Sequence, residues 1–160
     1  MRDILHMLEQ DGRLTAAEIA ERSGRPVEEV TRLIAEAEDA GIIRKYKAVI
    51  NWDRVGEHQQ TFAFIEVRVT PQREFGFDSI AERIMRFPEV HALYLLSGSY
   101  DLHVVVKGQD LRDIANFVTT KLAPLDNVLS TTTHFMLKGY KVDGDTLDDV
   151  DTPTRLAVTP

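Results

Sequence analysis

The chain has 160 residues, of which 43% are hydrophobic, and its formal net charge is −7. This composition fits one ordinary folded domain or two small ones and argues against disorder throughout. Because the sequence has no cysteine, it excludes disulfides, thiolate nucleophiles and thiolate-bound zinc. No apolar run approaches the roughly 18 to 20 residues that span a bilayer, and acids stand where a signal peptide would be apolar. We therefore expect a cytoplasmic protein with no membrane partner.

The charge is spread over both halves of the chain. Residues 1–60 hold 9 Lys and Arg against 12 Asp and Glu, and residues 61–160 hold 10 against 14. Phosphate neutralisation by Lys and Arg supplies most non-specific affinity for nucleic acid, so long-range attraction to DNA is expected to be weak. Any DNA binding must come from a local basic patch.

The first fifty residues predict three helices. Apolar residues in 4–8 predict a short first helix. Thr15 and Glu18 have the spacing of a capping box, which begins a second helix. The sequence Gly-Arg-Pro at 24–26 ends that helix and starts a third, whose apolar residues recur at helical spacing until Gly41. Two helices joined by a tight turn and packed on a first helix form a helix-turn-helix pattern.

Residues 42–50 alternate between apolar and polar side chains, which predicts a strand, and residues 51–60 are expected to be a turn or linker. We expect a domain boundary here. The predicted organisation is a helix-turn-helix domain at 1–50, a linker at 51–60, a second domain at 61–141 and a flexible, acidic arm at 142–160.

The second domain alternates strands and helices. Strands are predicted at 61–69, 90–96, 102–106 and 128–137, with a hairpin loop at 97–101. A helix is predicted at 76–87, and another at 110–122 with Leu111, Ile114, Ala115 and Val118 facing inward. The order strand, helix, strand, strand, helix, strand is a ferredoxin-like βαββαβ unit, so the fold class is α+β.

Three stretches in this order, at residues 41–51, 87–106 and 130–141, resemble the Lrp/AsnC (leucine-responsive regulator, feast/famine) family of transcription regulators. The resemblance covers about residues 2–141. It implies a winged helix-turn-helix that binds double-stranded DNA. It also implies a ligand-sensing domain that dimerises through its sheets and often forms larger rings such as octamers, and a small amino-acid effector.

The third helix departs from the family pattern. Residues 25–41 carry five carboxylates against two arginines. Many family members place several arginines along this helix, whereas the positions that we align with them here are Leu33, Ala35 and Glu36. The helix-turn-helix pattern is therefore kept, while its reading helix is altered.

The N-terminal residues of the second helix in a helix-turn-helix meet base edges. Arg32 could reach a guanine edge, Arg25 a phosphate and Glu28 a cytosine amino group, while the basic run at 44–47 would clamp the backbone. The predicted DNA-binding residues are Arg25, Glu28, Thr31, Arg32, Arg44, Lys45 and Lys47. The alternative is that this unit is a scaffold for dimer contacts and that these charges form a solvated face.

The turn at 97–101 is the second candidate site. Backbone N–H groups around Gly98 could form a concavity that binds a carboxylate, and Asp101 could receive an ammonium group. The resemblance places the family's effector pocket near this turn, at an interface between protomers. The predicted effector-binding residues are Ser97, Gly98, Ser99, Tyr100, Asp101, Thr131 and Thr133. The alternative is a hairpin with no ligand.

We expect no metal, cofactor or catalytic residue. The spacing of His91, His103 and His134 matches no ligand motif. The leading interpretation is a transcription regulator modulated by a small effector. One alternative is a metabolite-binding assembly module that no longer reads DNA. Another is an enzyme like the siroheme decarboxylases, which share this two-part architecture, although the sequence shows no nucleophile-base pair and no tetrapyrrole signature.

Overall fold

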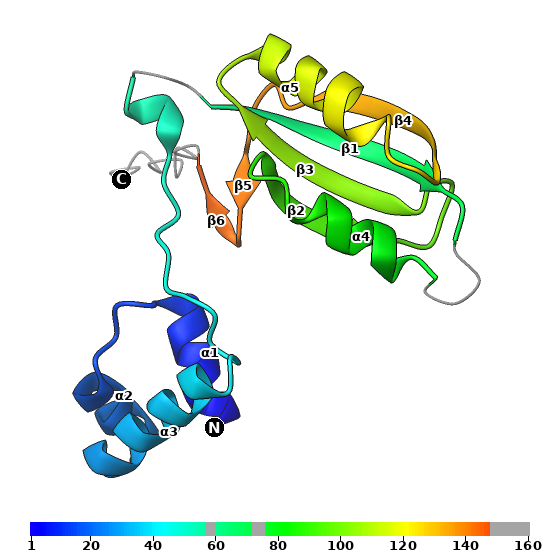
Figure 1. Cartoon of the computed structure of the whole chain (residues 1–160). Coiled ribbons are helices and arrows are strands. Elements are labelled where there is room, and N and C mark those ends of the chain that lie inside the picture. Colours follow the sequence, from blue (N-terminus) through cyan, green and yellow to red (C-terminus); the bar gives the residue numbers. More distant parts are fainter. Residues whose placement is uncertain (57–59, 72–75, 148–160) are drawn as a thin grey trace, which may run out of the picture. The chain divides into compact units, whose positions relative to one another are not determined.

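The computed structural model describes residues 1–56, 60–71 and 76–147. The chain divides into two compact units, Met1–Ile50 and Asn51–Pro160 (Figure 1). Within the described ranges, no helix is both long enough and apolar enough to cross a membrane.

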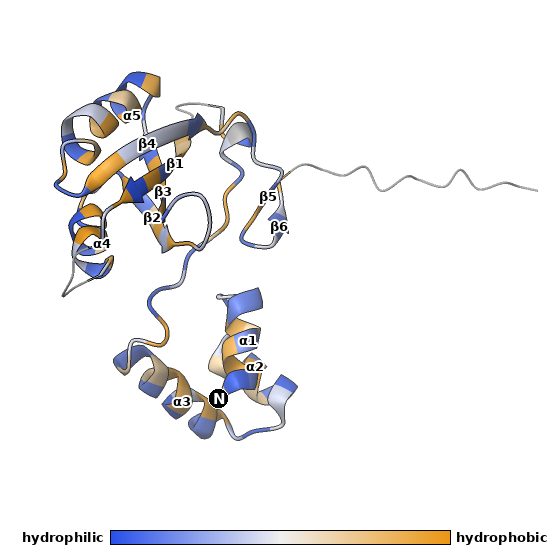
Figure 2. Ribbon diagram, turned by 90° about the vertical axis from the view of Figure 1, so that its right-hand side faces the viewer, coloured by the Kyte–Doolittle hydropathy of each residue, from blue (hydrophilic) through white to orange (hydrophobic). Residues whose placement is uncertain are grey.

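The first unit consists of three helices, α1 (Arg2–Gln10), α2 (Ala16–Ser23) and α3 (Val27–Asp39). Hydrophobic and hydrophilic residues alternate along each of them (Figure 2), so each has an apolar face to bury. The buried cluster takes residues from all three helices: Ile4, Leu8, Ile19, Ala20 and Val30. The predicted helix-turn-helix pattern is confirmed.

Local signals set the helix ends. The Thr15 side chain accepts a hydrogen bond from the Glu18 N–H at 3.3 Å, and the Thr15 N–H donates to the Glu18 carboxylate at 2.8 Å. This is the predicted capping box. Gly24 ends α2 with φ of +68°, a left-handed conformation that favours glycine and allows the tight turn into α3.

The prediction of a strand at 42–50 is wrong for this chain by itself. In the described residues no part of 42–50 pairs with a strand. A strand needs a partner to satisfy its backbone groups. Ile43 packs against the three-helix core, but the apolar residues that follow it are exposed. Ile42, Tyr46 and Ile50 are 58%, 46% and 45% exposed.

The second unit is built on one four-stranded antiparallel sheet in the order β2-β3-β1-β4. Its strands are β1 (Thr61–Val69), β2 (Val90–Leu95), β3 (Leu102–Gly108) and β4 (Val128–Phe135). Helix α4 (Asp78–Ile84) joins β1 to β2, and α5 (Leu111–Phe117), extended by a π-helical turn at Val118–Leu122, joins β3 to β4 (Figure 1). This is the predicted βαββαβ order.

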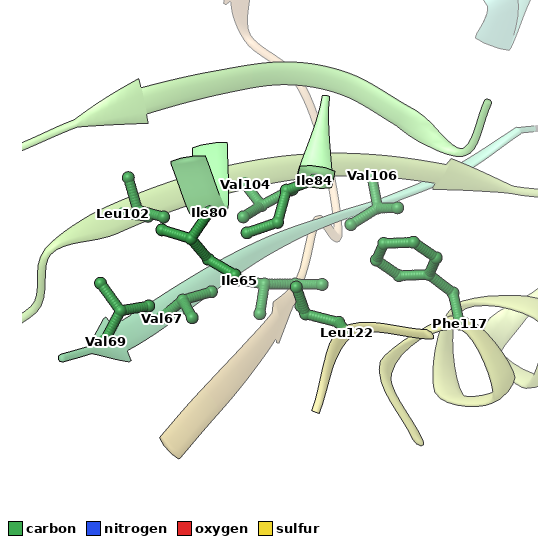
Figure 3. Close-up of a cluster of buried hydrophobic side chains, with 10 residues drawn as sticks. All are labelled: Ile65, Val67, Val69, Ile80, Ile84, Leu102, Val104, Val106, Phe117 and Leu122. Atoms are coloured by element: carbon green, nitrogen blue, oxygen red, sulfur yellow. The ribbon is translucent and has the colours of Figure 1, made fainter. Parts of the chain in front are cut away.

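Both helices pack on the same face of the sheet. Ala63, Ile65, Val67 and Val69 alternate along β1 and are all buried, as predicted. Figure 3 shows side chains of β1 and β3 pointing toward those of α4 and α5. The core cluster consists of Ile65, Val67, Val69, Ile80, Ile84, Leu102, Val104, Val106, Phe117 and Leu122. No helix of the described residues covers the other face of the sheet.

Helix α5 buries a different stripe from the predicted one. Leu111 is 55% exposed and Ala115 is also exposed, whereas Ile114 and Phe117 are buried. The Phe117 ring meets Phe87 edge-on, with the ring centroids 5.6 Å apart. The π-helical turn shifts the later part of the stripe. Ile114 and the half-buried Val118 face the core as predicted, whereas Leu111 and Ala115 do not, and the prediction missed Phe117.

The segment predicted as a flexible arm begins with a small hairpin. Strands β5 (Lys141–Val142) and β6 (Asp145–Thr146) pair in antiparallel fashion. Asp143 and Gly144 both have positive φ, at 49° and 96°, as a two-residue type I′ turn requires. The prediction of an arm over 142–160 is thus wrong at its start, and residues 148–160 lie outside the described residues.

The predicted linker contains a short 3-10 helix, η1 (Trp52–Arg54). The Asn51 side-chain amide just before it donates a hydrogen bond to the Leu147 carbonyl, just after the β5–β6 hairpin. The first and last described residues of the second unit are therefore joined to each other.

The α5 stripe can be tested by two truncations on the same helix. Phe117→Ala should lower the free energy of unfolding by about 3 to 5 kcal/mol because it leaves a cavity in the core. Leu111→Ala should change it by less than about 0.5 kcal/mol because its side chain is mostly exposed. Denaturant unfolding of both variants checks this. Equal losses would mean that Leu111 also packs inward.

Candidate DNA-binding and effector sites

Arg25 lies in the turn before α3, where it was predicted to contact a phosphate. Its Nε donates to the Asp3 carboxylate at 3.3 Å and its Nη1 donates to the Glu29 carboxylate at 2.6 Å. The hydrogen bond to Glu29 and the charge of Asp3 raise the pKa of the Arg25 guanidinium. On the other side of the contact, hydrogen bonding to the Met1 amino group and the charge of Arg25 lower the pKa of Asp3 to about 2. Arg25 is therefore held between two carboxylates.

Arg32, the predicted base-reading residue, has the same kind of partner. Its Nη1 donates to the Glu36 carboxylate one turn further along α3, at 2.7 Å. The two side chains are 62% and 51% exposed, so water surrounds the pair. An exposed pair at this spacing is weak, worth about 0.3 to 0.5 kcal/mol. Arg32 is thus oriented by Glu36 but can leave it at small cost.

The two other predicted residues of α3 are exposed. Glu28 lies in the first turn of the helix with its side chain in solvent. The Thr31 hydroxyl donates to the Val27 carbonyl at 2.9 Å, so this oxygen is left as an acceptor. Both can meet a partner that carries hydrogen-bond donors, such as the amino group of cytosine.

The basic run Arg44, Lys45 and Lys47 follows the C-terminal end of α3, and all three side chains are exposed. The Arg44 guanidinium lies close to the end of the helix, since a Cβ added to Gly41 would lie 3.2 Å from its Nη1. Tyr46, within the run, donates a hydrogen bond to Glu38 at 2.9 Å. The hydrogen bond of Tyr46 holds the basic run against α3, and the charged side chains of the run are exposed to solvent.

The sequence interpretation missed the partners of the two arginines. Glu29 and Glu36 each stand four residues after the arginine that they bind, a spacing that places both side chains on one helix face. This signal was present in the sequence. The contact between Arg25 and Asp3 of α1 had no such signal because 22 residues separate them.

The turn at 97–101 is held to the sheet through Asp101. Its backbone N–H donates to the Val67 carbonyl at 3.0 Å, and its carbonyl accepts from the Leu96 N–H at 2.9 Å. Its carboxylate Oδ2 accepts from the Val69 N–H at 2.9 Å. Asp101 therefore locks the β2–β3 hairpin onto the end of β1, a role beyond the predicted contact with an ammonium group.

Neither the backbone conformation nor the packing of the chain requires a glycine at position 98. Gly98 does not have a left-handed backbone conformation, and a Cβ added to it would meet no atom within 4 Å. The Tyr100 hydroxyl lies 3.5 Å from Nδ1 of His103, and the two rings are 6.1 Å apart. The space over Gly98 is open, and an aromatic side chain stands two residues away.

The two threonines predicted for the effector site lie on β4, across β1 from the turn. Val67 pairs with Leu102 on one side and with Thr131 on the other, so a single strand separates Thr131 from the start of β3. Thr133 pairs with Ile65, two residues further from the turn. The structure thus brings Thr131 to the same end of the sheet as Asp101 and places Thr133 further away.

Two surface hollows of about 380 Å³ and 460 Å³ lie in the second unit, and no predicted effector residue lines either of them. The first lies between α4 and β2, and the second beside α5. Within residues 1–56, 60–71 and 76–147, no three His, Asp or Glu side chains gather as metal ligands would.

Comparison with known proteins identifies the two units. Residues 1–44 match the family model of a winged helix-turn-helix DNA-binding domain, and residues 62–146 match that of the Lrp/AsnC ligand binding domain. The chain is 46% identical over 158 residues to the HTH-type transcriptional regulator YugG of Bacillus subtilis, covering 99% of this chain and 95% of that protein. It is 30% identical over 138 residues to the leucine-responsive regulatory protein of Rhizobium meliloti, covering 86% of this chain and 87% of that one.

Solved structures agree. A transcriptional regulator of Neisseria meningitidis, solved as its L-Met complex, is 28% identical with a TM-score of 0.68 and covers 88% of this chain and 89% of its own. The leucine response regulatory protein of Mycobacterium tuberculosis is 25% identical with a TM-score of 0.72, covering 92% and 97%. A helix-turn-helix followed by this sheet unit, matched along nearly the whole chain, is the arrangement of these regulators. The chain belongs to the Lrp/AsnC family of DNA-binding transcriptional regulators.

Proposed function

We propose that this regulator reads DNA with α3 and the basic run at 44–47, and that an amino-acid effector bound at an interface between protomers biases its DNA affinity. The observation that carries the first part is the exposed face of α3, where Arg32 and Glu28 lie at the helix positions that meet base edges in a helix-turn-helix. The second part rests on the linkage of this unit, in one chain, to a ligand binding domain.

The carboxylates of α3 do not prevent contact with a polyanion. Glu36 and Asp39 lie in the later half of the helix, which leaves the groove. The pair of Arg32 with Glu36 is exposed, and its small net stability lets a guanine edge or a phosphate replace the carboxylate. Lys45 and Arg44 would neutralise backbone phosphates beside it. Because each arginine must give up a carboxylate to bind DNA, one helix-turn-helix unit by itself binds weakly. Binding by two such units together is favoured.

The effector would bind over the turn at 97–101. In the described residues, Oδ2 of Asp101 is used by the Val69 N–H, while Oδ1 accepts no hydrogen bond and can take an ammonium group. The open space over Gly98 lets a ligand carboxylate approach the backbone. The L-Met complex of the Neisseria relative supports an amino acid as the ligand class.

The helix-free face of the sheet is the surface that we propose for dimerisation, with larger rings such as octamers built from dimers. Phe64 and His103 stack on this face with their rings 5.6 Å apart, and Tyr94 beside them is 54% exposed. Aromatic side chains at this exposure favour an interface. An effector that binds better in one assembly would shift the spacing of the DNA-binding units, and DNA would shift effector affinity by the same factor.

A second candidate function is a metabolite-binding assembly module that does not read DNA. The observation that favours it is that Arg32 of α3 and Arg25 just before α3 are already bound by carboxylates. The variants below separate the two functions, because only the regulator loses an activity when the basic run is reversed.

Glu36→Gln is expected to tighten DNA binding by up to about fivefold, because it releases Arg32 from a pair worth at most about 1 kcal/mol. Asp39→Asn removes the same charge from the last turn of α3 without freeing Arg32 and should have a smaller effect. Fluorescence anisotropy with a promoter fragment, at equal salt, measures both. Equal effects would mean that general charge, and not Arg32, limits binding.

Arg44→Glu combined with Lys45→Glu should weaken DNA binding by more than tenfold at about 50 mM salt and reduce the slope of log affinity against log salt by roughly 2. Ligand-induced changes in oligomer mass, followed by analytical ultracentrifugation, should persist. Unchanged DNA affinity would favour the assembly module.

A thermal-shift panel of the twenty amino acids should identify the effector, because a ligand at about 100 times its dissociation constant adds roughly 2.7 kcal/mol to stability. Gly98→Val should abolish that shift while leaving the melting temperature of the free protein nearly unchanged, because Gly98 has no left-handed backbone conformation and a Cβ at this position meets no atom within 4 Å. A shift that survives in this variant would place the effector elsewhere.

A further inference from the structure

Tyr46 stands inside the basic run, between Lys45 and Lys47, and it contacts the helical unit on two sides. Its ring lies over the loop between α1 and α2, since a Cβ added to Gly12 would lie 3.4 Å from Cδ1 of Tyr46 and 3.9 Å from its Cβ. Its hydroxyl donates a hydrogen bond to Oε1 of Glu38, in the last turn of α3, at 2.9 Å. One side chain therefore joins the basic run both to α3 and to the loop that precedes α2.

The Tyr46 hydroxyl is a donor at neutral pH. The pKa of Tyr46 is raised above its ordinary value, first by partial burial and then by the hydrogen bond to Glu38 and the charge of that carboxylate. The proton therefore stays on the phenol oxygen, and the carboxylate is the acceptor. A hydrogen bond to a charged acceptor is stronger than one between neutral groups, so this contact can hold an irregular segment in one position.

Two attachments flank the first two cations of the run. On one side, the Ile43 side chain packs against the three-helix core, and its N–H donates to a carbonyl of α3 at 3.0 Å. On the other side stands Tyr46. Between them Arg44 and Lys45 are exposed, and residues 44–50 form neither helix nor strand. Such a segment loses conformational entropy when DNA fixes it, unless contacts within the protein have already ordered it.

Charge alone would give Glu38 the opposite effect on DNA binding. It is one of five carboxylates in residues 25–41, so its removal should strengthen the attraction to phosphate. Asp39, the next residue, carries the same charge, but its side chain makes no hydrogen bond or ion pair with the described part of the chain. The two neighbouring acids therefore differ in one respect, which is the bond to Tyr46.

We propose that Tyr46 is a positioning residue for DNA binding, which orders the basic run through its hydrogen bond to Glu38. Glu38 supports DNA binding as the acceptor of this bond, although its charge repels phosphate. The inference rests on the proposed reading of DNA by α3 and the basic run. It goes further because it gives one acid of the reading helix a positive part in binding a polyanion.

The hydroxyl can be removed without the ring. In the full-length protein, Tyr46→Phe should weaken binding to a genomic fragment that the wild type binds by about fivefold, the value of one ordinary hydrogen bond. The slope of log affinity against log salt should stay unchanged, because the same phosphates are neutralised. Fluorescence anisotropy measures both, and an equal melting temperature shows that the variant is folded.

Substitutions of Glu38 separate positioning from charge, because two of them remove the same charge. Glu38→Gln keeps an acceptor for the Tyr46 hydroxyl and should bind DNA at least as tightly as the wild type. Glu38→Ala removes the acceptor and should bind about fivefold more weakly than Glu38→Gln. Adding Tyr46→Phe to Glu38→Ala should cost nothing further. Asp39→Ala, the matched control, should not weaken binding.

Trypsin, which cleaves after Lys and Arg, reports the order of the run without DNA. Cleavage after residues 44, 45 and 47, followed by mass spectrometry, should be faster in Tyr46→Phe and Glu38→Ala than in the wild type or Asp39→Ala. The proposal is overturned if Tyr46→Phe binds DNA like the wild type, if Glu38→Ala binds as tightly as Glu38→Gln, or if cleavage is unchanged. A wild type that binds no fragment at about 50 mM salt would instead contradict the proposed function, and the cleavage rates would still decide whether the bond orders the run.

Discussion

Arg25, just before the helix that we expect to read DNA, and Arg32, on that helix, are each bound by a carboxylate four residues further along the chain, Glu29 and Glu36. These pairs decide how the first unit can act. They neutralise the helix locally, so the acidic sequence does not produce a face that simply repels phosphate. They also oblige each arginine to exchange one anion for another when DNA binds, which limits the gain from a single contact.

Because each helix-turn-helix unit would gain little binding free energy, we expect affinity to come from several units together and from the basic run after α3. Both requirements link DNA binding to assembly. In the second unit, the surface that we propose for assembly is the aromatic face of the sheet, and Asp101 locks the turn at 97–101 to β1. Effector binding near that turn would then change DNA affinity by changing which heads can bind at once. We therefore propose that the assembly is the point of control.

The sequence was sufficient where local rules act alone. The capping box of Thr15 and Glu18, the alternation along β1 and the βαββαβ order follow from hydrogen bonding and periodicity within a few residues. Prediction from the sequence failed where the local structure depends on contacts with residues distant in the chain. The alternation at 42–50 predicted a strand, but a strand forms only if another strand lies beside it. Phe117 lies three residues after Ile114, at ordinary helical spacing, and was missed because the predicted stripe ran through Leu111 and Ala115 instead.

The candidate sites show the same division. The pairs within α3 could have been predicted from the i to i+4 spacing, whereas the attachment of Asp101 to Val69 joins residues 32 apart and needs the fold. Proximity across the sheet likewise placed Thr131 nearer to the turn than Thr133, which the sequence treated as equivalent.

The central claim is that α3 and the basic run contact DNA phosphates in spite of the acidic helix. The most direct measurement is the dependence of DNA affinity on salt concentration, with the full-length protein and a genomic fragment library. We expect binding at about 50 mM salt and a linear fall of log affinity with log salt, with a slope of roughly −0.9 for each phosphate contacted. No binding at that salt to any fragment, or an affinity that does not change with salt, would contradict the account.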